Sequence, residues 1–389
     1  MKELKASISL FQITFLGVGT MVGAGIYVLV GKIAGLSGGL SLWAFVAAAI
    51  IVSFSAYSHG FLAKHIPSSA GAAEYAHRAF HSSHLTLAVG LGVLLTGIVS
   101  SAVLVNGFYG YLNEFIVMPQ WLVITGLTGI LLVIASQAVN TSVNFAVGIT
   151  FLELLGLAIV ILFSESGHFE PELQMPSWSI SSFQLIMAGA FVAFYAYVGF
   201  EDMVNLAEEV EQPEKTMLPG IMLALIMTTF LYLLVAWVAL HALPIQQLAE
   251  SDAPFAAMLA HTPWLGKTIS LIGLIAIVNG ALVQILMGSR MLFGLSRDKH
   301  LPAFLAVLNS KHIPINATYC VGALVLLFAL ALPLLTLAKI TSGIILIVFT
   351  IVNTSAVVIA LQNKQYASAS VAAIGATLSL IFVVSGLFP

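Results

Sequence analysis

The sequence has very few charged residues and almost no cysteine. Only 7% of its 389 residues are Asp, Glu, Lys or Arg, against about 25% in soluble domains. Cys320 is the single cysteine, which excludes an intrachain disulfide. The formal net charge of −3 is too small to indicate a nucleic acid partner. The ten histidines form no HExxH motif or other tight ligand set, so no metal and no cofactor are expected.

Apolar residues dominate the chain instead. They make up 60% of the sequence, and the mean hydropathy is +1.07. This composition predicts an all-α protein embedded in the lipid bilayer. The start, "MKELKASISLFQITFLG", resembles a signal peptide, but its apolar run continues past residue 30 without a clear cleavage site. We therefore expect a retained first helix.

A membrane-spanning helix needs about 20 mostly apolar residues. Eleven stretches meet this requirement, at about 9–33, 40–63, 85–112, 119–138, 143–163, 182–208, 219–241, 265–296, 315–334, 339–361 and 368–387. The connections between them reach only about 20 residues, which is too short for a separate soluble domain. Residues 1–389 are therefore expected to form a single integral membrane domain.

The basic residues predict the orientation of these spans. Ten Lys and Arg side chains fall on the side of the N-terminus, and only Lys32, Lys267 and Lys339 fall on the other. Because cytoplasmic loops carry the excess of Lys and Arg, we expect a multi-pass protein of the cytoplasmic (inner) membrane. Its N-terminus is expected in the cytoplasm and its C-terminus outside. His59 and His241 lie near span ends, where an interfacial position is expected.

A short amphipathic stretch follows the second span. "IPSSAGAAEYAHRAF" (66–80) alternates polar and apolar residues and carries Glu74 and Arg78 four positions apart, a spacing that favours a helical ion pair. It predicts a short helix at the cytoplasmic surface, serving as a solvated connector or as a gating element.

Two spans carry a weak point near their middle. "GTMVGAGIYV" (19–28) contains three glycines, and "MAGAFVAFYAYVGFEDMVNLAEEV" (187–210) is interrupted by Gly199 before Glu201 and Asp202. Gly19 and Gly23 alone also fit a GxxxG helix-packing motif. Interrupted helices in spans one and six predict two inverted five-helix repeats, at about 9–163 and 182–361, followed by a trailing helix at about 368–387.

A broken helix offers unpaired backbone groups to a ligand. The N–H groups that open its second half attract a carboxylate, and the carbonyls that end its first half accept hydrogen bonds from an ammonium group. An α-amino acid carries both groups. The glycines permit the unusual backbone angles and a close approach of the ligand.

The motifs resemble those of the amino acid–polyamine–organocation (APC) superfamily of transporters. The similar segments are "GTMVGAGIYVLVG" (19–31), "IPSSAGAAEYAHRAF" (66–80), "AFYAYVGFEDMVNLAEEVEQPEKTMLPGI" (193–221) and "GSRMLFGLSRDKHLP" (288–302). The resemblance implies a LeuT-type fold, although many members have twelve spans. It also implies a substrate site in which the backbone of Gly23, Ala24 and Gly25 binds the carboxylate. Carbonyls near Met21, with Tyr195, Ala196 and Val198, would bind the amino group, with the break at Gly199. Tyr195 and Tyr197 either close over the ligand or pack in the core.

Ionisable and polar residues within spans are candidates for coupling and gating. Glu153 occupies the position at which several proton-coupled relatives resemble one another in having a lysine. In an apolar environment its neutral form is favoured, so we expect it to carry or gate a coupling proton, or else to be held by a structural hydrogen bond. Glu201 and Asp202 are expected to move the sixth helix or to pair with basic residues. Sodium-coupled relatives resemble one another in using hydroxyl ligands from the eighth helix, which here offers only Asn279 and Gln284.

The expected function is secondary active transport of an amino acid by alternating access, with a proton as the coupling ion. Few charges lie within the spans, which favours a small or apolar neutral substrate. An ion-independent exchanger and a non-transporting sensor or channel are the alternatives. An intramembrane enzyme is disfavoured because no Ser–His, paired Asp or HExxH constellation stands out. The oligomeric state is not indicated.

Overall fold

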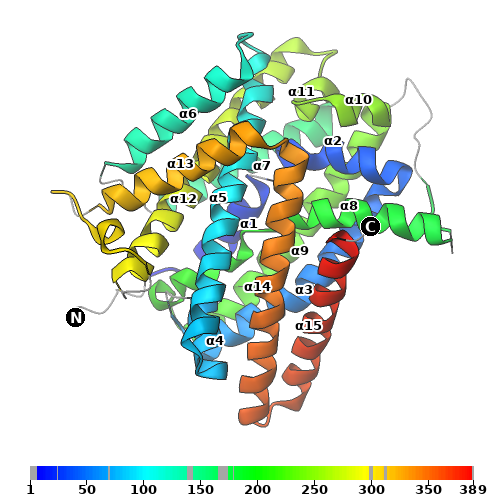
Figure 1. Ribbon diagram of the computed structural model, residues 1–389. Helices are drawn as coiled ribbons and strands as arrows, with labels where there is room; N and C mark the ends of the chain where they lie inside the picture. Colours follow the sequence, from blue (N-terminus) through cyan, green and yellow to red (C-terminus); the bar gives the residue numbers. More distant parts are fainter. Residues whose placement is uncertain are drawn as a thin grey trace.

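The protein is almost entirely helical (Figure 1). The computed structural model describes residues 7–23, 25–68, 71–137, 143–164, 174–177, 179–297, 301–310 and 313–387. The α-helices are α1 Leu10–Val22, α2 Ile26–Ser37, α3 Ser41–His65, α4 Gly71–Phe80, α5 Ser83–Asn113, α6 Gln120–Ala135, α7 Val143–Phe163, α8 Ile180–Ala196, α9 Pro213–Ala242, α10 Ile245–Glu250, α11 Pro254–Met258, α12 Pro263–Arg297, α13 Ile315–Ala331, α14 Leu334–Gln362 and α15 Tyr366–Leu387. The 3₁₀ helices are η1 Gly38–Leu40, η2 Phe200–Glu209 and η3 Ala303–Ala306.

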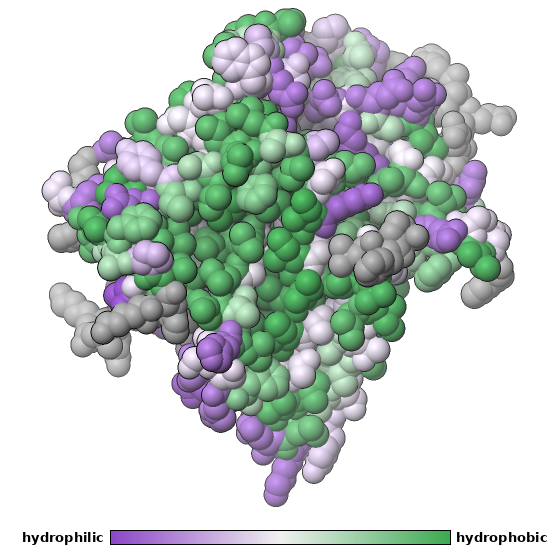
Figure 2. All heavy atoms as spheres, in the orientation of Figure 1, coloured by the Kyte–Doolittle hydropathy of each residue, from purple (hydrophilic) through white to green (hydrophobic). Residues whose placement is uncertain are grey.

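The described helices suit a membrane environment. Eight helical segments are long and apolar enough to cross a bilayer, and α1, α6 and α13 are shorter apolar helices. Large apolar side chains lie exposed on the outside of the bundle, such as Phe151, Leu155 and Leu162 on α7. Figure 2 shows a broad hydrophobic belt with hydrophilic residues gathered above and below it. The predicted all-helical membrane class is confirmed.

The first apolar stretch is interrupted where its glycines predict. Helix α1 begins with a capping box, in which Ser9 and Gln12 satisfy each other's backbone N–H groups. It ends at Val22, and α2 begins at Ile26. A side chain at Gly25 would overlap the backbone of Ala196. The two interrupted segments therefore touch, and only glycine allows this contact.

The sixth apolar stretch is interrupted as well. Helix α8 ends at Ala196, and the backbone turns at Gly199, whose φ of +126° disfavours any residue with a side chain. The chain then continues as η2, a 3₁₀ helix of ten residues. Such long 3₁₀ runs are uncommon because their hydrogen-bond geometry is poorer than that of an α-helix.

Helix α1 and η2 are joined at both ends. At the end that lies beside the interruptions, the Thr20 hydroxyl donates to the Gly199 carbonyl at 3.0 Å. At the other end, the backbone N–H groups of Ser7 and Ile8 donate to the Glu209 carbonyl at 2.8 and 2.9 Å. The N–H of Glu211 returns a bond of 2.9 Å to the Ile8 carbonyl. These contacts make α1 and η2 one structural unit.

The remaining helices support this pair. Helices α14 and α15 pack against each other and against α3 (Figure 1).

The prediction that His59 lies at the membrane interface is wrong, because its ring is fully buried between Phe200 and Phe349. The predicted surface helix is present as α4, with the Arg78 Nε donating to Glu74 Oε1 at 2.7 Å. Helices α10 and α11 were not expected, because six and five residues are too few for a periodic pattern.

Candidate functional site

A cavity of about 420 Å³ lies beside the two helix interruptions. Its walls come from α1, α5, α7, α8, η2 and α12. The deep end is formed by buried residues that include Gly23, Glu153 and Tyr195, whereas Arg290 at the other end is exposed. The cavity therefore extends from the interruptions toward the surface at which α1 begins and α12 ends.

The α8 side of the cavity is fixed by a hydroxyl pair. The Tyr195 hydroxyl lies 2.9 Å from Ser100 Oγ and also donates to the Ser100 carbonyl at 3.3 Å. This anchors the last turn of α8 to α5, and Tyr195 lines the cavity. Val198 and Asn279 also line the cavity. This part of the lining therefore combines an apolar side chain with polar groups, two of which hold each other in place.

Glu153 is the buried charge-bearing residue at this deep end. It is 2% exposed, and the Tyr27 hydroxyl donates to its backbone carbonyl at 2.8 Å. Its Oε1 lies over the end of α1, only 2.5 Å from where a Cβ on Gly23 would stand. Its Oε2 is buried and has no hydrogen-bond partner among the described residues. A buried carboxylate oxygen without a partner raises the free energy of the folded protein. A proton or a cation bound at this oxygen would lower it.

Tyr232 of α9 connects the two interruptions. Its hydroxyl donates to the Met21 carbonyl at 2.7 Å and to the Ala196 carbonyl at 2.6 Å. These carbonyls belong to the ends of α1 and α8, which lack intrahelical partners. Sequence reasoning missed Tyr232, although it is the one tyrosine in the apolar run "TTFLYLLVAW" (228–237). A lone polar aromatic in the middle of a span is the signal that could have identified it.

The two acidic residues after Gly199 lie in different places. Asp202 lines the cavity, and Gln284 Nε2 donates to its Oδ2 at 3.3 Å. Glu201 lies outside the lining of the cavity, and its Oε2 accepts the Gly199 N–H at 2.8 Å. Glu201 therefore caps the turn between α8 and η2, and Asp202 is the η2 carboxylate that a molecule in the cavity would meet.

The structure gathers some of the predicted substrate-site residues at the cavity and leaves others behind its wall. Of the predicted substrate-binding residues, Gly23, Tyr195 and Val198 line it, and so do the coupling and gating candidates Glu153 and Asn279. Met21, Gly25, Ala196, Tyr197 and Gly199 lie outside its lining. The ring of Tyr197 packs on Tyr232 at 5.1 Å between centroids. Ala24 lies outside the described residues. Ligand roles for all of these residues stay predictions.

A buried cluster of aromatic rings begins at Tyr27, whose hydroxyl donates to the carbonyl of Glu153 in the cavity lining. Tyr27 packs edge-on against Tyr111 and Phe255, with centroids 6.4 and 5.0 Å apart, and all three are fully buried. The Tyr111 hydroxyl donates to the Tyr27 carbonyl at 2.7 Å. None of the three rings lines the cavity or a second one of about 680 Å³, which Lys32 and Asp252 help to line.

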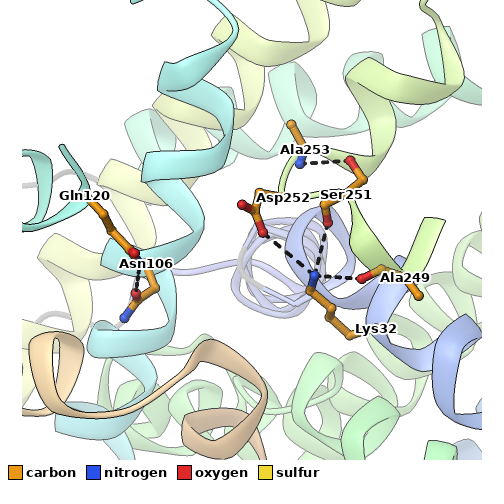
Figure 3. A network of polar contacts seen from close by, with 7 residues as sticks. All are labelled: Lys32, Asn106, Gln120, Ala249, Ser251, Asp252 and Ala253. Carbon is orange, nitrogen blue, oxygen red and sulfur yellow. Dashed lines mark hydrogen bonds and ion pairs between the residues drawn. The ribbon is translucent and has the colours of Figure 1, made fainter. Parts of the chain in front are cut away.

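Lys32 of α2 binds the end of α10 and the residues that follow it. Figure 3 shows its amine pointing at the end of α10 and the residues after it. Lys32 Nζ donates to the carbonyls of Ala249 and Ser251 at 2.7 and 3.3 Å, and it lies 3.7 Å from Asp252 Oδ1. Gly31 packs directly on the Leu248 carbonyl. The α10 segment is therefore held against α2.

Comparisons with known proteins agree with a transport protein. The amino acid permease family model matches residues 8–389. The branched-chain amino acid permease BcaP of Bacillus subtilis is 25% identical, over 94% of this chain and 82% of the relative. The methylthioribose transporter of Bacillus subtilis is 27% identical, over 94% and 83%. The inner membrane transport protein YbaT of Escherichia coli is 28% identical, over 98% and 90%.

Proposed function

The chain belongs to the amino acid permease family, and from this membership we propose that it moves an amino acid across the membrane by alternating access. It is a transporter and not an enzyme. The observation that carries the proposal is the cavity itself, which reaches both helix interruptions and extends to the exposed Arg290. Alternating access requires a site beside such interruptions that opens to one surface at a time.

We assign the eleven apolar segments to eleven spans. In this assignment, α1 with α2 forms a discontinuous first helix, and α8 with η2 forms a discontinuous sixth helix. Two inverted repeats, at about 9–163 and 182–361, then precede the trailing helix α15. We place the protein in the inner membrane with its N-terminus in the cytoplasm. The cavity then faces the cytoplasm, and the Lys32 side faces outward. The mutual contact of the two interruptions supports this arrangement.

We further propose a small or apolar neutral amino acid as the substrate. Its carboxylate would meet the N–H groups that open α2, next to Gly23. Its side chain would lie among Leu104, Val198 and Val283, which line the cavity. The relative BcaP is a branched-chain amino acid permease, which supports an apolar side chain. The methylthioribose relative indicates that family membership alone does not fix the substrate.

A proton is the proposed coupling ion, with Glu153 as the group that carries it. The buried Oε2 without a partner supports this role, because protonation removes the cost of a buried charge. In proteoliposomes, uptake by the wild-type protein should change with pH. Uptake by the E153Q variant should be independent of pH. An unchanged pH dependence in E153Q would contradict the proton role.

Reconstitution distinguishes the transporter from its alternatives. The purified protein is first screened by thermal shift against the proteinogenic amino acids, because a ligand stabilises by RT ln(1 + [L]/Kd). Radiolabelled uptake of the stabilising amino acid then follows, with and without a pH gradient. Uptake only when substrate is present on the far side would identify an ion-independent exchanger. Binding without any movement of label would identify a sensor and refute transport.

A further inference from the structure

We propose that Glu153 binds the protonated amino group of the substrate, and that this amino group and a proton compete for the same carboxylate. This assignment rests on the proposed function only in taking the cavity as the substrate site. It replaces backbone carbonyls with a side-chain carboxylate as the main partner of the amine. It also sets the direction of coupling.

The first reason is the state of the Glu153 carboxylate. It lies at the deep end of the cavity, on the end of α1, and is 2% exposed. The Oε2 atom has no partner in the part of the chain that the structure describes. An ionised carboxylate in this place needs a cation beside it, and otherwise it takes up a proton. Both occupants are small and positively charged.

The second reason is that the backbone alternative is already engaged. The carbonyls of Met21 and Ala196 accept the Tyr232 hydroxyl. Each carbonyl keeps one further lone pair, but both lie outside the cavity lining. An ammonium group has three donors and a full positive charge. Glu153, which does line the cavity, supplies the matching charge, and charge-assisted hydrogen bonds are the stronger ones.

The third reason is that the groups facing Glu153 leave its carboxylate available. The Tyr27 hydroxyl donates to the Glu153 carbonyl and not to its carboxylate. Thr150 Oγ1 donates to the Ala146 carbonyl at 3.1 Å. Helix α1, which packs on α7, contains no titratable side chain. The charged and titratable groups that the other surrounding elements turn toward the site are Tyr27 of α2, Tyr195 of α8, Asp202 of η2, Tyr232 of α9 and Arg290 of α12.

Shared occupancy has a consequence for coupling. The substrate brings its own positive charge, so the proton on Glu153 must leave to cavity water when the amine binds. On the return step the carboxylate takes up a proton again. Each cycle therefore exchanges one proton for one amine, which is antiport. The same site accepts primary amines without a carboxylate, since the charge pair does not require one.

Three compounds with one carbon skeleton test this assignment on the purified full-length protein. They are L-leucine, 3-methylbutylamine, which lacks the carboxylate, and 4-methylpentanoate, which lacks the amine. We expect 3-methylbutylamine to bind, and its Kd to rise up to about tenfold for each pH unit of acidification while Glu153 takes up one proton. We expect 4-methylpentanoate not to bind. Titration calorimetry in two buffers of different ionisation enthalpy should show up to one proton released per amine.

Matched variants separate Glu153 from its neighbours. In E153Q the amine should lose its pH-dependent binding and its proton release, and E153D, which keeps the carboxylate, should retain both. Melting of each variant without ligand shows whether it is folded. The D202N variant makes the same change on the other carboxylate of the cavity. Loss of the pH dependence in D202N and not in E153Q would overturn the assignment, as would equal amine binding by E153Q and wild type.

Three further outcomes complete the test. Stabilisation by NaCl but not by choline chloride, lost in E153Q and without any amine effect, would make the site a sodium site and overturn the proposal. Failure of all twenty amino acids to bind, with Glu153-dependent binding of 3-methylbutylamine retained, would refute the amino acid function and leave the amine site supported. If 3-methylbutylamine did not bind while leucine uptake stayed intact, the amine site on Glu153 would be refuted and the amino acid function would remain supported.

Discussion

Replacing Gly25 with alanine tests whether this glycine serves packing. Two effects oppose each other. The φ and ψ of Gly25, −86° and −54°, are open to alanine, so restricting the unfolded chain should stabilise the protein by about 0.4–1 kcal/mol. The new Cβ, however, would overlap Ala196 Cα and lie 2.6 Å from Ala196 Cβ. Overpacking of this kind costs about 1–3 kcal/mol. The steric term is larger, and we expect a net loss of about 1–2 kcal/mol.

A matched control variant should gain stability instead of losing it. Gly148 lies on α7, where an added Cβ would meet nothing within 4 Å. The G148A variant should therefore be about 0.5–1 kcal/mol more stable than wild type, because alanine favours the helix. Thermal unfolding in detergent, followed by the fluorescence of the five tryptophans, measures both variants.

A second-site change sharpens the test. The A196G variant removes the Cβ that the new side chain would meet, although the Ala196 Cα remains in its way. Combined with G25A it should restore part of the lost stability, giving a coupling energy between the two positions. If G25A melted at or above wild type, the packing explanation of this glycine would be refuted.

Four further variants test other contacts. Y232F removes the hydroxyl that two buried carbonyls share and should lower stability by about 1–3 kcal/mol. A melting temperature equal to that of wild type would show that this hydroxyl does not stabilise the two interruptions. G199A places a side chain at φ +126° and against the Thr20 carbonyl, with an expected loss of about 1–3 kcal/mol, and unchanged melting would contradict the strained turn. K32M should raise hydrogen–deuterium exchange across residues 245–258. D252N should change it little, since exposed ion pairs contribute about 0–1 kcal/mol; equal effects would show that the ion pair, not the carbonyl contacts, holds α10.

The sequence could predict where the helices lie and where two of them are interrupted. Apolar runs and glycines are local features, and the backbone follows them directly. The lone tyrosine in its apolar run marks Tyr232, but its partner could not be predicted, because the carbonyl of Met21 lies 211 residues away. The sequence also offered no ground for distinguishing the adjacent acids Glu201 and Asp202. In the 3₁₀ geometry of η2, with three residues per turn, Asp202 reaches the cavity and Glu201 turns back to Gly199.

The winding of η2 also sets a length. A 3₁₀ helix rises about 2.0 Å per residue and an α-helix 1.5 Å, so the ten residues Phe200–Glu209 would shorten by about 5 Å if they rewound as an α-helix. The far end of η2 is tied to Ile8 by backbone hydrogen bonds. Helix α1 is also joined to the near end of η2, through the bond from Thr20 to the Gly199 carbonyl, so a rewinding of η2 could not keep both connections. The two connections therefore hold η2 in its longer 3₁₀ form, and rewinding would require one of them to break.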